Sequence, residues 1–156
     1  MSFIPITAVT TSVLSLYYVT LTARVVVKRI GLQVSIGDAS KEVFIEYAKD
    51  PSKDVKTLYK KYEALRASIR AHGNFGEYVP LTMILFGLAE HSGSLPKIAL
   101  QIISGGVLFS RILHIEFGLH GKNHVGPGRV AGSASMLACI VALSGSLLIQ
   151  NINNFF

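Results

Sequence analysis

The sequence predicts an all-α integral membrane protein whose membrane part is a four-helix transmembrane bundle. Of its 156 residues, 50% are hydrophobic and only 15% are charged, whereas soluble domains carry about 25% charged residues. Eleven of the 15 Lys and Arg lie between Arg24 and Arg70, and four long apolar stretches lie around this basic segment. The pattern excludes a soluble globule and a disordered tail. It also excludes a nucleic-acid-binding protein despite the net charge of +6, because such proteins set basic residues on a charged background.

Each apolar stretch is assigned a span from its length, since about 20 apolar helical residues cross a bilayer. The first, at about 3–28, has no positive segment before it and is longer than a signal-peptide core of about 7–15 residues. The second must extend beyond the apolar run 79–89 back through Glu77 and Asn74. The third contains Arg111, His114 and Glu116, and the fourth has no charge from Val130 to Ile149. The later spans are predicted at 70–91, 97–119 and 129–150, within one domain covering 1–156.

The distribution of Lys and Arg predicts the orientation of these spans. The segment 29–69 and the connection from Lys122 to Arg129 are basic, whereas neither terminus carries Lys or Arg. By the positive-inside rule, both basic connections face the cytoplasm and both termini face away from it. Within the cytoplasmic segment, apolar residues recur every three or four positions from Val55 to Ile69. This spacing predicts an amphipathic helix leading into the second span, with a solvated or headgroup-facing basic side.

Ionisable residues in the second span indicate a functional site. Arg70, Asn74 and Glu77 are spaced i, i+4 and i+7, so they share one helix face. A charge at the bilayer centre costs at least about 2.5 kcal/mol. The face must therefore point into the bundle, towards a partner subunit or into a wet pocket. An Arg70–Glu77 ion pair that only joins helices is the structural alternative. Pro80 cannot donate to the carbonyl of Gly76, which predicts a kink that opens a cleft.

The third and fourth spans also carry ionisable residues. Glu116 is expected to pair with Arg111 or with a neighbouring helix, and Arg129 begins the last span as an interfacial anchor or a cation aimed into the cleft. The spacing of His114, His120 and His124 argues against a metal site, and Cys139 is expected to pack inertly. Gly128 and Gly132 form a G-x-x-x-G step that could let helices approach closely, but without a second instance we interpret it as ordinary helix packing. A set of five arginines is placed at the cytoplasmic end, as a cation-rich pocket for a small ligand with carboxylates: Arg24, Arg29, Arg70, Arg111 and Arg129.

The run R-A-H-G-N-F-G-E-Y-V-P, from Arg70 to Pro80, resembles the R-A-x-x-N-x-x-E-x-x-P signature of the membrane-associated proteins in eicosanoid and glutathione metabolism, the MAPEG family. R-I-L-H at 111–114 and Arg129 support the resemblance, which covers nearly the whole chain. V-S-I-G-D at 34–38 is similar to the bacterial branch, so a bacterial inner membrane is expected. The resemblance implies a homotrimer of four-helix subunits that binds glutathione between adjacent subunits. It implies a glutathione transferase of the microsomal type.

The resemblance also implies roles for individual residues. Arg129 would be catalytic, stabilising the glutathione thiolate. His114 and Gly118 occupy positions that are tyrosines in the eicosanoid branch, which favours a general transferase or peroxidase over leukotriene synthesis. The expected partners are other copies of the chain, membrane lipid, glutathione as co-substrate and a lipophilic electrophile, with no metal. The alternative is a non-catalytic member that binds a lipid, glutathione or a partner protein. The implied glutathione-binding residues are Arg29, Arg70, His72, Asn74, Glu77, Tyr78, Arg111 and His114.

Overall fold

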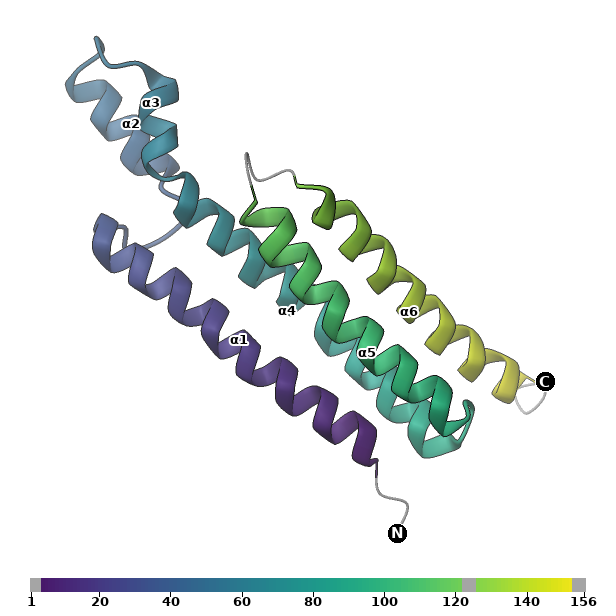
Figure 1. The fold of residues 1–156 in the computed structure, drawn as a ribbon. Coiled ribbons are helices and arrows are strands. Elements are labelled where there is room, and N and C mark those ends of the chain that lie inside the picture. The colour runs from purple at the N-terminus through teal and green to yellow at the C-terminus, as the bar shows by residue number, and fades with distance from the viewer. Residues whose placement is uncertain (1–3, 122–125, 153–156) are drawn as a thin grey trace.

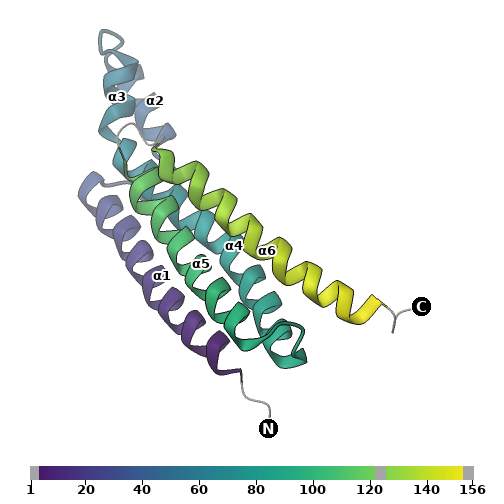
Figure 2. The same cartoon turned by 45° about the vertical axis from the view of Figure 1, so that its right-hand side comes forward.

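The computed structural model describes residues 4–121 and 126–152, and within these residues every regular element is a helix. Four helices are long, and they lie side by side (Figures 1 and 2). The start of α1 and the end of α6 lie at one end of the molecule, and the two short helices α2 and α3 lie at the other (Figure 1). The elements are α1 (Pro5–Leu32), α2 (Ser40–Lys49), α3 (Val55–Lys61), α4 (Glu63–Ser92), α5 (Lys97–His114), the π-helical turn η1 (Ile115–Leu119) and α6 (Pro127–Asn151).

Three of the predicted spans correspond to helices that are long and apolar enough to cross a membrane. These helices, within the described residues, are Pro5–Leu32, Lys97–Leu119 and Pro127–Asn151. The predicted second span, 70–91, is also helical, since it lies within α4 and passes through Pro80. However, α4 is not among the three helices that meet the criterion. The first half of α4 carries the charged residues of the predicted site, which make this helix less apolar than the other three. That α4 crosses the membrane is therefore still a prediction.

Apolar side chains fill the space between the four long helices and also cover much of their outer surface. Leu21, Phe86 and Met136 are almost fully buried in the core. On the outer faces, Leu16, Ile102 and other large apolar side chains are more than half exposed. A soluble protein seldom leaves so much apolar surface in contact with water. These outer faces fit contact with lipid or with another subunit.

The segment before the second span differs from the single amphipathic helix predicted. A turn at Tyr62 separates α3 from α4, and α2, which was not predicted, packs beside α3. Val43 of α2 and Leu58 of α3 are both buried in a second, smaller apolar cluster. The apolar periodicity from Val55 to Ile69 identified the buried face of α3, but it did not predict that α2 covers this face.

A carboxylate joins these short helices. Glu46 Oε1 accepts hydrogen bonds from Lys61 Nζ and Tyr62 OH, each at 2.6 Å. The donors Lys61 and Tyr62 lower the pKa of the Glu46 carboxyl. The carboxylate therefore stays ionised at neutral pH and keeps both contacts. This pairing holds α2 against the turn that leads into α4.

Glu90 fastens the opposite end of α4 to the start of α1. Its carboxylate accepts from Ile6 N at 2.9 Å, Thr7 N at 2.7 Å and Thr7 Oγ1 at 2.6 Å. The first amides of a helix have no partner within the helix, so a carboxylate there replaces the missing acceptors. The side chain of Glu90 thus acts as an N-terminal cap supplied from another helix.

Replacing Glu90 with Ala is expected to lower the free energy of unfolding by about 0.5–2 kcal/mol, the usual cost of losing an N-cap. Thermal unfolding in detergent, followed by circular dichroism, measures the change. Glu90→Gln keeps the length and one acceptor oxygen, so it should lose less. Equal stability of wild type and Glu90→Ala would contradict the capping role.

Candidate functional site

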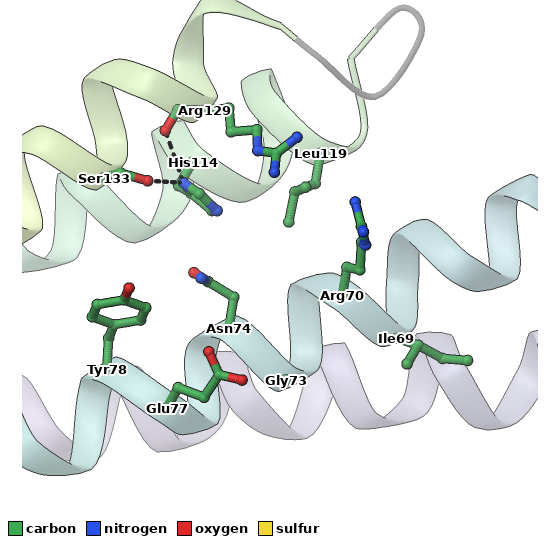
Figure 3. A pocket seen from close by; sticks show the side chains of 10 residues that line it. All are labelled: Ile69, Arg70, Gly73, Asn74, Glu77, Tyr78, His114, Leu119, Arg129 and Ser133. Atoms are coloured by element: carbon green, nitrogen blue, oxygen red, sulfur yellow. Dashed lines mark hydrogen bonds between the residues drawn. The ribbon is translucent and has the colours of Figure 1, made fainter. Parts of the chain in front are cut away.

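A cavity of about 490 Å³ lies between α4 on one side and α5, η1 and α6 on the other. It is at the end of the long helices that carries α2 and α3. Figure 3 shows Arg70, Asn74 and Tyr78 extending from α4 towards the wall that carries His114 and Arg129. Six of the nine predicted site residues line the cavity: Arg70, Asn74, Glu77, Tyr78, His114 and Arg129. The other lining residues, Ile69, Gly73, Leu119 and Ser133, were not predicted, although Ser133 is one helical turn after Arg129.

The α4 wall carries the predicted polar face. Arg70, Asn74 and Glu77 line the same cavity, as their spacing indicates. Among the described residues, neither Arg70 nor Glu77 forms a side-chain hydrogen bond or an ion pair, and both are exposed. An Arg70–Glu77 ion pair is therefore absent from this part of the chain. Both charges are available to a ligand.

Arg111 lies behind this wall and does not line the cavity. It is 1% exposed, and its Nη1 donates to Asn74 Oδ1 at 3.0 Å. Its Nη2 donates to the carbonyl of Gly132 at 3.4 Å, and its guanidinium carbon lies 5.7 Å from the Tyr78 ring centroid. Because Arg111 occupies the Asn74 oxygen, the Asn74 NH₂ group is left as a donor for the cavity. The structure thus makes Arg111 a positioning residue for Asn74.

The opposite wall is built where α5 ends and α6 begins. His114 Nδ1 lies 3.0 Å from the carbonyl oxygen of Arg129 and 3.0 Å from Ser133 Oγ. The Arg129 guanidinium has no hydrogen-bond or ion-pair partner among the described residues. Figure 3 shows Arg70 and Arg129 reaching into the cavity from opposite walls. Two cations without a partner among the described residues therefore line one cavity.

Glycines let the two helices of this wall approach closely. A Cβ added to Gly132 would lie 2.6 Å from the Cβ of His114, and one on Gly118 would lie 2.7 Å from the backbone nitrogen of Arg129. Gly128 is equally crowded by Leu113 and Phe117. The Gly128–Gly132 step is thus a close backbone contact, which the interpretation as ordinary packing missed because the opposing residues are distant in sequence. A tyrosine at 118 has no room in this fold.

Within one subunit the five predicted arginines do not form one cluster, since of the five Arg70 and Arg129 alone line the cavity. Arg24 Nη1 instead pairs with Glu116 Oε1 at 2.6 Å, and Tyr17 OH donates to the same oxygen at 2.8 Å. Glu116 therefore pairs with a neighbouring helix and not with Arg111. Arg24 and Arg29 are five positions apart on α1, and residues five apart on an α-helix lie about 140° apart around its axis, so these two side chains leave α1 on different sides.

Arg29 and His72 also lie outside the cavity lining. Arg29 Nη2 donates to the carbonyl of Gly37 at 2.8 Å. The His72 ring stacks on Tyr18, with ring centroids 4.6 Å apart, between α4 and α1. Within one subunit, neither side chain lines the hollow that holds the other predicted residues.

The described residues contain no cluster of three or more His, Cys, Asp or Glu able to hold a metal ion. His124 and Lys122, used in the sequence predictions, lie outside the described residues. Cys139 is buried against Gly106, without a disulfide partner. The Cys139 thiol does not line the cavity.

Comparison with protein families finds that the model of the MAPEG family matches residues 7–149. This range includes both walls of the cavity and all four long helices in large part. Comparison with curated proteins and with solved structures found no match.

Proposed function

The chain belongs to the MAPEG family, and from this premise we propose that it is a membrane-bound glutathione transferase. It holds glutathione in the cavity between α4 and α6 and presents its thiolate to lipophilic electrophiles. Membership of the family, with three apolar helices long enough to cross a bilayer, identifies an integral membrane protein of the glutathione and eicosanoid family. The glutathione transferase reaction itself is our proposal.

One observation supports the proposal above all. Three charged side chains, Arg70, Glu77 and Arg129, line one cavity and have no charged partner among the described residues. Glutathione carries two carboxylates, one ammonium and one thiol. The two guanidinium groups suit carboxylate and thiolate, and the carboxylate of Glu77 suits the ammonium. Asn74 adds its NH₂ donors.

Arg129 supplies the main chemical effect in this proposal. A cation beside the sulfur favours the thiolate over the thiol, whose pKa in free cysteine is about 8.5. Stabilising the charged nucleophile and placing it near an electrophile accelerates the reaction without a covalent enzyme intermediate. The electrophile, or a lipid hydroperoxide in a peroxidase reaction, enters from the apolar outer faces of the helices.

The proposal includes a four-helix transmembrane subunit, with α4 as the fourth span, that assembles as a homotrimer. The cavity faces the cytoplasm and both termini face away, in a bacterial inner membrane. Arg29 and His72, which lie outside the cavity of their own subunit, are proposed to reach glutathione in a neighbouring subunit. Chemical crosslinking in detergent should saturate at the trimer, and saturation at the dimer would contradict this assembly.

Glu77→Ala is expected to weaken glutathione binding by about tenfold or more, because a hydrogen bond to a charged group contributes about 1.5–3 kcal/mol. Isothermal titration of purified protein in detergent measures the affinity. Glu42→Ala, which changes a carboxylate on α2 outside the cavity, is the control and should leave the affinity unchanged.

Two results would contradict this function. If wild type binds no glutathione at millimolar concentration, glutathione is not the ligand. If wild type binds it and Glu77→Ala binds equally well, Glu77 does not hold the ammonium. The crosslinking result is independent of both.

A further inference from the structure

The hydrogen bonds of His114 determine which of its ring nitrogens carries a proton. Nδ1 lies 3.0 Å from the carbonyl oxygen of Arg129, and a carbonyl oxygen can only accept a hydrogen bond. Nδ1 must therefore donate, and Ser133 Oγ at 3.0 Å is a second acceptor for the same N–H. In a neutral imidazole with a proton on Nδ1, Nε2 carries a lone pair. His114 is 4% exposed, so the protein holds the ring in this orientation.

The unprotonated nitrogen faces the cavity. His114 lines the cavity, and Figure 3 shows its second ring nitrogen turned away from Arg129 O and Ser133, into the space opposite Asn74. No described residue forms a hydrogen bond with Nε2. His114 thus presents a nitrogen lone pair to the cavity that the Arg129 guanidinium also lines, where it would stabilise a thiolate.

We propose that His114 is the general base that deprotonates glutathione, an inference that rests on the proposed function. The S–H bond of the bound thiol breaks, its electron pair stays on sulfur, and the proton moves to Nε2. The product is a thiolate beside Arg129 and an imidazolium with a proton on each nitrogen. Arg129 O continues to accept from Nδ1, which stabilises the cation. After the thiolate attacks, the imidazolium returns its proton to the leaving group or to water.

The charged side chains around His114 allow its ring to take up a proton and release it again. Arg70, Glu77 and Tyr78 face the site from α4, Arg111 lies on the same helix as His114, and Arg129 lies on α6. Glu116 of η1 and His120, which follows η1, instead contact each other and Arg24 of α1. The arginines oppose a lasting positive charge on the ring, so the proton is held only briefly.

The decisive variant is His114→Asn. The amide nitrogen of Asn occupies the place of Nδ1 and can still donate to Arg129 O, but no basic nitrogen faces the cavity. After mixing with glutathione, the ultraviolet absorbance of the thiolate should appear at least about 100-fold more slowly than in wild type. Affinity for S-methylglutathione, which has no thiol proton, should be unchanged. His91→Asn makes the same change at the far end of α4 and should match wild type.

Two further measurements do not depend on that variant. His114→Ala should regain rapid thiolate formation when imidazole is added, because the free base can enter the vacated space. In wild type with weak buffer and an indicator dye, proton release should lag behind the thiolate absorbance, because the imidazole holds the proton first.

An unchanged rate in His114→Asn, failure of imidazole to rescue His114→Ala, or simultaneous proton release and thiolate formation would each overturn the role of His114. None of these three outcomes concerns the binding of S-methylglutathione by wild type. If wild type does not bind S-methylglutathione, the proposed function is wrong, and the role of His114 as a general base is wrong as well.

Discussion

Arg129→Ala should abolish the thiolate absorbance of bound glutathione while leaving glutathione bound. The Arg129 guanidinium lines the cavity without a hydrogen-bond or ion-pair partner among the described residues, so its charge is not already neutralised. Removing one preorganised group that stabilises developing negative charge typically costs about 10²–10³ in rate. We expect a fall of that size in conjugation of a lipophilic electrophile, measured by steady-state kinetics. The remaining contacts from Arg70, Asn74 and Glu77 should retain most of the affinity.

Arg129→Lys is the matched variant for this result. It keeps the positive charge on a shorter donor, so part of the thiolate signal should survive. Equal thiolate absorbance in wild type and Arg129→Ala would contradict the role of Arg129. If wild type itself binds glutathione without forming a thiolate, the chain is a non-catalytic member of the family.

Gly132→Ala should destabilise the protein, whereas Gly145→Ala should not. A Cβ at 132 would lie 2.6 Å from His114 Cβ and 2.7 Å from the carbonyl oxygen of Ser110. Backbone and Cβ atoms cannot move aside without separating α5 from α6, and such overpacking costs about 1–3 kcal/mol. At Gly145, on the same helix, nothing lies within 4 Å. There the change should be neutral or stabilise by about 0.5–1 kcal/mol, because Ala favours helix more than Gly.

Thermal unfolding in detergent, followed by circular dichroism, compares these two variants directly. Gly132→Ala should also weaken thiolate formation, since it displaces His114 from Arg129. Similar unfolding temperatures for both variants would show that α5 and α6 can separate at no cost. That result would remove the packing argument for how this wall is built.

The helices and the polar face of α4 could be predicted because they depend on local geometry. Apolar length determines where a helix can cross a bilayer, and the spacing of Arg70, Asn74 and Glu77 places them on one side of any helix. The family match over 7–149 agrees with the signature in the same segment. In contrast, α2 was not predicted, since its few apolar residues become meaningful only when α3 covers them.

The sequence alone thus determined the long helices, their apolar faces and which residues of α4 face a common side. The tertiary structure decided which arginines remain available to a ligand. Arg24 pairs with Glu116, and Arg111 is buried against Asn74, whereas Arg70 and Arg129 keep their charges unpaired within the described residues. The physical reason is that a side chain's partner depends on how helices pack. That packing depends on a close backbone approach at Gly118 and Gly132, between residues far apart along the chain.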